Sequence, residues 1–165
     1  MSRIASSPAD LRQILSASLR ITPAGAVEIL NAAELRQSGA ATIAWTAAFS
    51  TDEATVAAAQ WLARAAAAAA GIHSASIAPL YAARAENAYE GLTVPALNLR
   101  SQVFAMARTA LETAAAMDGA ALIFELARSE QTYTFQRPAD YATSVLCGAI
   151  AAGWRGPVFI QGDHY

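Results

Sequence analysis

Apolar side chains recur at helical spacing through the first half of the chain. A helix that begins at Pro8 and ends near Arg20 is predicted by apolar positions at Leu11, Ile14, Leu15 and Leu19. The segments 31–34 and 50–53 carry capping signals for two more helices, the second running to Gly71. Between the first two helices, 21–30 suggests a turn and a short strand, and 74–89 predicts a further helix.

After Glu90 the pattern changes to strands that alternate with helices. Strands are predicted at 92–99, 120–126 and 157–161, and helices at 101–117 and 138–153. Such alternation indicates an α/β fold with a parallel sheet built by crossover connections. We expect a mostly helical extension over 1–90, followed over 91–165 by the first three strands of an incomplete (β/α)8 barrel. The strand at 157–161 would then lack its next neighbour and expose an edge.

Composition narrows the classes of function. With 165 residues, 55% hydrophobic and 15% charged, the chain can bury the core of one ordinary domain. A formal charge of −2 and the lack of any basic run argue against nucleic acid as a partner. The single cysteine, Cys147, is interpreted as a core residue. No signal peptide or long apolar run is recognisable, so we expect a cytoplasmic protein with no membrane partner.

Polar residues stand at the ends of all three predicted strands. Asp163 and His164 follow Gly162 at the end of the last strand, where a parallel barrel carries its chemistry. Asn98 and Glu125 interrupt the apolar runs of the other two. Buried polar groups of this kind need partners. For Asn98 both backbone bonding and substrate contact stay open; for Glu125 we expect an ion pair with Arg128 or Arg100.

The segments VPALNL (94–99), ALIFE (121–125) and VFIQGDH (158–164) resemble the first three strands of class II, metal-dependent fructose- or tagatose-bisphosphate aldolases. The resemblance covers 92–165 and implies a TIM barrel. It implies that Asp163 is the general acid/base, that His164 is the first of three zinc-binding histidines, and that Asn98 contacts substrate. The family's serine after the second strand would fall on Ala127, so Ser129, two places on, becomes the candidate for that contact.

The chemistry of an aldol reaction agrees with a metal. The enolate left by cleavage is stabilised either by an iminium on lysine or by a Lewis-acidic metal, and the chain contains no lysine. A catalytic zinc takes about three protein ligands. The other imidazole, His73, follows a predicted helix end and is interpreted as a capping or surface residue. Arg128 and Arg137 could steer an anion from the loop after the second strand, although most loop arginines are only solvated.

Three functions compete at this point. The first is a metal-dependent aldolase acting in its full-length form on a phosphorylated ketose, with Zn²⁺ as cofactor and the 165-residue chain alone inactive. The alternative is a non-catalytic, barrel-type accessory or structural subunit of an aldolase system. The third is another metal-assisted reaction, such as hydrolysis, because fold alone does not fix function. A homo-oligomer is compatible with each of them.

Overall fold

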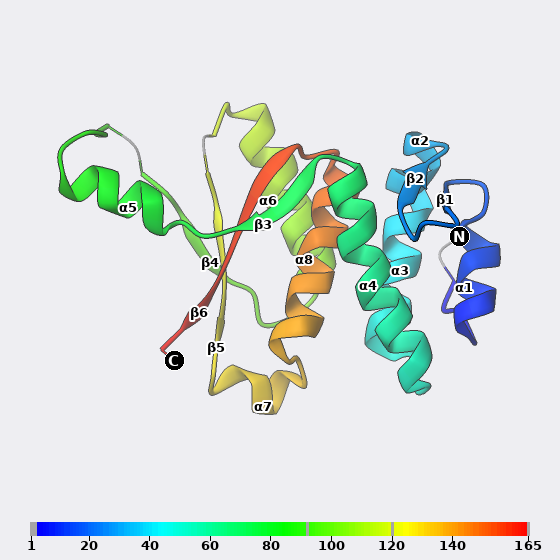
Figure 1. Cartoon of the computed structure of the whole chain (residues 1–165). Coiled ribbons are helices and arrows are strands. Elements are labelled where there is room, and N and C mark those ends of the chain that lie inside the picture. Colours follow the sequence, from blue (N-terminus) through cyan, green and yellow to red (C-terminus); the bar gives the residue numbers. More distant parts are fainter. Residues whose placement is uncertain (1–2, 92, 120, 165) are drawn as a thin grey trace.

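The structure is a computed structural model that describes residues 3–91, 93–119 and 121–164. Figure 1 shows an N-terminal group of helices on one side and a twisted sheet on the other. The elements in chain order are α1 (Pro8–Leu15), β1 (Leu19–Ile21), β2 (Val27–Ile29), α2 (Ala32–Glu34), the π-helical turn η1 (Leu35–Gly39), α3 (Ala40–Phe49), α4 (Glu53–Ala69), β3 (Ile72–Ala75), α5 (Ala78–Ala85), β4 (Ala96–Asn98), α6 (Val103–Ala116), β5 (Ile123–Ala127), α7 (Glu130–Thr134), α8 (Pro138–Ala152) and β6 (Gly156–Asp163).

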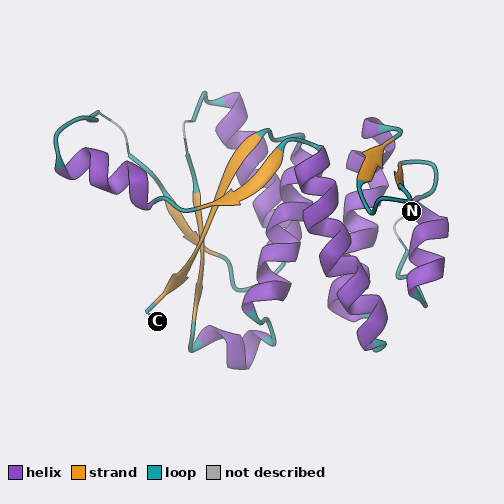
Figure 2. Cartoon of the chain, in the orientation of Figure 1, coloured by secondary structure: helices purple, strands orange, loops and turns teal. Residues whose placement is uncertain are grey.

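The α/β class expected from the sequence is confirmed, with a parallel four-stranded sheet in the order β3-β6-β5-β4. Strands β4, β5 and β6 are neighbours in chain order, joined through α6 and α8, as the alternating pattern indicates. The described residues form an open sheet and show no closed barrel. Figure 2 shows the strands crossing between the long helices and the separate α5.

Strand β3 corrects two expectations. The predicted helix over 74–89 is replaced by β3 and the shorter α5. The last strand also has a neighbour on its second side, because β3 pairs with β6 from Ile72 opposite Gly156 to Ala75 opposite Phe159. Gly71, with a φ of 75°, ends the preceding helix and turns the chain into this strand. The sheet thus takes strands from both sides of the boundary expected near Glu90.

Local capping signals set the helix starts in the N-terminal part. The side chains of Ser7, Asn31 and Asp52 accept hydrogen bonds from the backbone N–H groups of the first turns of α1, α2 and α4. The first helix ends at Leu15, not near Arg20, because Leu19–Ile21 pairs with Val27–Ile29 in an antiparallel hairpin. Within the described residues, no helix is both long and apolar enough to cross a membrane.

The core lies between one face of the sheet and the helices. Phe124, Leu126 and Val158 point from the sheet into a cluster that includes Leu111 and Val145 of α6 and α8. The helices α3 and α4 pack on the outer side of α8, and Cys147 is buried there as expected. Successive strand residues alternate between the two faces of a sheet. The side chain of Glu125, between Phe124 and Leu126, therefore faces away from α6 and α8. On that side α5 projects away from the sheet (Figure 1) and has no buried residue.

Candidate functional site

The sheet face turned away from α6 and α8 carries a group of polar residues near the carboxyl ends of its strands. In the strand register Asn98 lies opposite Glu125, Glu125 opposite Gln161, and Ala127 opposite Asp163. All five residues share one face because their positions differ by even numbers along each strand. In a (β/α)8 barrel the helices lie outside, so the enclosed face would be the one that carries these residues. Asn98 and Asp163 both lie on it, with β5 between their strands.

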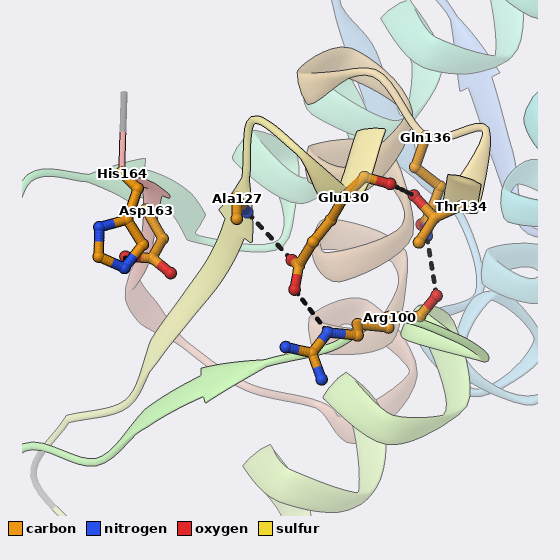
Figure 3. A network of polar contacts seen from close by, with 7 residues as sticks. All are labelled: Arg100, Ala127, Glu130, Thr134, Gln136, Asp163 and His164. Atoms are coloured by element: carbon orange, nitrogen blue, oxygen red, sulfur yellow. Dashed lines mark hydrogen bonds and ion pairs between the residues drawn. The ribbon is translucent and has the colours of Figure 1, made fainter. Parts of the chain in front are cut away.

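Asp163 and His164 are close neighbours at the end of β6. The His164 Nε2 atom lies 3.3 Å from Asp163 Oδ1, and Figure 3 shows the imidazole ring beside the carboxylate. The Asp163 side chain is 30% exposed and the His164 side chain 88% exposed. His164 has a φ of 53°, a left-handed conformation that turns its side chain out of the alternation of the strand. The pair thus offers a half-covered carboxylate and an accessible imidazole.

Glu125 finds a different partner from the one expected. Its Oε1 accepts a hydrogen bond from Gln161 Nε2 on the neighbouring strand, and the expected ion pair with Arg128 or Arg100 does not form among the described residues. The cross-strand register explains the difference, since it places Gln161 directly opposite Glu125. The carboxylate of Glu125 therefore bonds Gln161, while Arg100 bonds Glu130.

Asn98 has an unmet acceptor. Its Oδ1 atom is buried and lacks a hydrogen-bond partner among the described residues, while hydrogen bonding of the same side chain with Glu130 contributes to a lowered pKa of that glutamate. A buried carbonyl oxygen without a partner costs free energy on the order of 1–3 kcal/mol. Such an atom suits a residue whose partner is a ligand or a bound water.

A buried glutamate that the sequence did not single out organises the ends of β4 and β5. Glu130 is 3% exposed, and its carboxylate accepts hydrogen bonds from Arg100 Nε at 2.5 Å and from the Ala127 backbone N–H at 3.1 Å (Figure 3). Burial acts to raise the pKa of Glu130, but the bonds from Arg100 and Ala127 outweigh it and hold the pKa below its ordinary value. Glu130 is therefore an ionised, structurally fixed carboxylate.

The other candidates lie outside this group. Ser129 is exposed at the start of α7 and its side chain makes no capping bond. His73 is exposed on β3 opposite Pro157, at the amino end of β6, and so lies away from His164. Arg137 caps α8, its backbone and side chain bonding Asp140. The sequence signal that could have revealed Glu130 is weak, because a single glutamate three residues after a strand resembles many solvated loop residues.

A metal site is only partly provided by these residues. Over residues 3–91, 93–119 and 121–164, no group of three or more histidine, cysteine, aspartate or glutamate side chains is arranged to hold a metal ion. Zinc in a catalytic site takes about three protein ligands. His164 is exposed and could supply one of them, with Asp163 beside it. The described residues therefore fit the start of a metal site and not a complete one.

A hollow of about 520 Å³ lies on the opposite, helix-covered side of the sheet. Leu126, Tyr141, Ala142, Ile160 and Gly162 contribute to its lining. The hydroxyl of Tyr141 is buried with no partner among the described residues, and burial raises the pKa of that phenol well above its ordinary value. Gln161, a member of the polar group, also contributes to the lining, whereas Asp163 does not.

Comparison of the chain with protein-family models, with curated proteins and with solved structures found no match. The fold and the polar strand ends define an α/β protein with a parallel sheet. Any more specific assignment depends on the residues themselves.

Proposed function

We propose that this chain contributes Asn98, Asp163 and His164 to the active site of a metal-dependent aldolase-like protein that cleaves or forms a carbon–carbon bond of a phosphorylated ketose. The observation that carries the proposal is the placement of Asp163. Its half-exposed carboxylate shares a sheet face with the unmet acceptor of Asn98, and the His164 imidazole lies 3.3 Å away. In parallel α/β folds, ligands bind at the carboxyl ends of the strands.

Each residue has a distinct role in this proposal. The Asp163 carboxylate takes the proton from the hydroxyl group next to the bond that breaks, and returns it in the reverse reaction. Asn98 accepts a hydrogen bond from a substrate hydroxyl through Oδ1. His164 supplies one ligand of a divalent metal such as Zn²⁺, which polarises a carbonyl when bound. The proposal requires the remaining ligands to come from outside the described residues, in a (β/α)8 barrel of which this sheet would form part.

The test measures aldol cleavage by the protein that contains this chain. Ketose bisphosphates and monophosphates are supplied, and the triose product is quantified before and after chelation and on return of Zn²⁺. Asp163→Asn should lower kcat by about 10²–10⁴-fold, the usual contribution of a general acid/base. Ser129→Ala serves as the matched control at the weakest candidate position. Cleavage that survives complete metal removal, or an Asp163→Asn variant of full activity, would contradict the proposal.

A non-catalytic accessory subunit remains the second candidate, and one observation favours it. Strand β3 occupies the edge of β6 that the fourth strand of a barrel would need, from Gly156 to Phe159. Because β3 already pairs with this edge of β6, a further barrel strand could not form hydrogen bonds with the same residues. An accessory subunit would lack turnover with every substrate, and Asp163→Asn would then leave its effect on a partner enzyme unchanged.

A further inference from the structure

We propose that Arg100 binds an anionic group of the substrate, a phosphoryl or a carboxylate, in a site whose opposite side is formed by Asp163. The site is a row of three residues, Arg100, Ala127 and Asp163, across the carboxyl ends of β4, β5 and β6. This inference rests on the proposed function for the role of Asp163. The anion site itself stands on separate observations.

Hydrogen bonds and the strand register define the row. The Glu130 carboxylate bonds both Arg100 Nε and the backbone N–H of Ala127, so the arginine side chain lies beside the end of β5. Ala127 in turn lies opposite Asp163 in the register of β5 and β6. Two strand spacings of roughly 4.8 Å separate β4 from β6 by about 10 Å, and Arg100 lies two residues beyond the end of β4. A small molecule can bridge this distance with one end on each group.

Burial is distributed unequally within the Arg100–Glu130 ion pair. The Glu130 side chain is 5% exposed, whereas the Arg100 side chain is 63% exposed. Glu130 engages the Nε atom, the Tyr133 side chain also interacts with the guanidinium, and in Figure 3 the guanidinium extends toward the side on which Asp163 and His164 lie. A guanidinium presents planar paired donors that match carboxylate and phosphate oxygens. The buried carboxylate thus orients the cation through its Nε donor, while most of the arginine side chain stays exposed.

The surrounding chain holds this arrangement in place. Gln136 Nε2 donates to the backbone oxygen of Arg100 at 3.4 Å, and the Thr134 hydroxyl donates to the backbone oxygen of Glu130 at 2.7 Å. The first contact links the loop after α7 to the segment after β4, and the second lies within α7. A cation fixed before the ligand arrives loses less conformational entropy on binding. Such preorganisation is typical of a binding residue and exceeds what a solvated surface pair requires.

Ala127 gives the row its shape. Its methyl group, 6% exposed, is the small side chain between Arg100 and Asp163, and a bulkier residue here would intrude between the two charged groups. The site therefore suits a short hydroxy or keto compound with an anionic group a few carbon atoms from the hydroxyl that exchanges its proton with Asp163. That description fits a phosphorylated sugar and also a sugar acid.

The test measures binding of inorganic phosphate and, in a separate arm, of acetate to the protein by calorimetry or by NMR chemical shifts. We expect Arg100→Gln to weaken binding of the preferred anion at least tenfold and Arg100→Lys to weaken it less. Arg108→Gln, which removes an arginine paired with Glu112 on the surface of α6, is the matched control and should change nothing. Tighter phosphate binding would identify a phosphoryl group, and tighter acetate binding a carboxylate.

Binding of neither anion by the unmodified protein, or equal binding by Arg100→Gln, overturns the inference. Circular dichroism of each variant separates loss of binding from loss of the fold. The two proposals fail differently. Absence of aldol cleavage with Arg100-dependent anion binding intact removes the aldolase proposal alone, whereas cleavage whose KM is unchanged in Arg100→Gln removes the anion site alone.

Discussion

The backbone N–H of Gly156 donates a hydrogen bond to the carbonyl oxygen of Gly71 at 2.8 Å. This contact begins the pairing of β6 with β3 and connects the first ninety residues to the strand that carries Asp163. The helices α3 and α4, also from that part, pack against α8. The support of the candidate site thus extends well beyond the strands to which it belongs.

The first prediction concerns removal of residues 1–90. We expect the remaining 91–165 to lose cooperative unfolding, because β6 would lose its β3 neighbour and α8 would expose the face now covered by α3 and α4. Urea denaturation followed by far-UV circular dichroism compares the fragment with the whole chain. A fragment that unfolds in one sharp transition would show that 91–165 is an independent domain and that 1–90 is an appended extension.

The second prediction concerns Glu130 and acid. Since its folded pKa lies below the unfolded value near 4.5, the ionised carboxylate stabilises the fold above that pH, and the contribution is lost as the pH falls through the lower folded pKa. Glu130→Gln should therefore reduce the free energy of unfolding most at neutral pH. The difference from the unmodified chain should shrink as the pH falls below about 4.5.

Urea titrations across this pH range provide the measurement. Glu112→Gln is the control, because that carboxylate pairs with Arg108 on an exposed helix surface, where ion pairs contribute little. A gap between Glu130→Gln and the unmodified chain that stays constant down to low pH would mean that Glu130 is not held ionised by Arg100 and Ala127.

The third prediction concerns Cys147, the only cysteine of the chain. Burial raises the pKa of its thiol to about 12. At pH 8 the thiolate fraction is then roughly one part in ten thousand, and thiol reagents also lack access. We expect Ellman's reagent to label the native protein very slowly and the urea-unfolded protein within minutes. Rapid labelling without denaturant would show that α8 is not packed as described.

The fourth prediction concerns the close contact of α6 and α8. A Cβ atom added at Gly148 would lie 2.8 Å from the Phe104 backbone oxygen and 3.0 Å from Ala107 Cβ. Gly148→Ala gains about 1 kcal/mol of helix propensity but overpacks a helix contact against backbone, at a cost of roughly 1–3 kcal/mol. We expect a net loss of stability in urea denaturation.

An exposed position calibrates that measurement. Ala105→Gly on the outer surface of α6 should cost about 1 kcal/mol through propensity alone. If Gly148→Ala instead stabilised the protein by a similar amount, the two helices would have to be further apart than the structure places them.

Much of the local structure could be predicted from the sequence. The segments 7–10 and 50–53 were predicted as helix starts, although the structure makes Asp52 the cap of the second, and the alternation after Glu90 predicted three parallel strands in the correct order. The sequence also placed Asn98 and Asp163 at strand ends, and the register then put them on one face. The aldolase resemblance, the zinc ligand role of His164, the substrate contact of Ser129 and the location in the cell stay predictions.

What the residues alone determined is what depends on near neighbours: helix caps, apolar periodicity and the polar interruptions at strand ends. What only the tertiary structure decided depends on partners far apart in the chain. The segment Ile72–Ala75 becomes a strand because β6 offers it hydrogen bonds, and Glu130 becomes a buried, ionised orienting group because Arg100 and Ala127 meet its carboxylate. Both outcomes depend on contacts between distant segments, β3 with β6 and Arg100 with Glu130, which short-range sequence patterns do not encode.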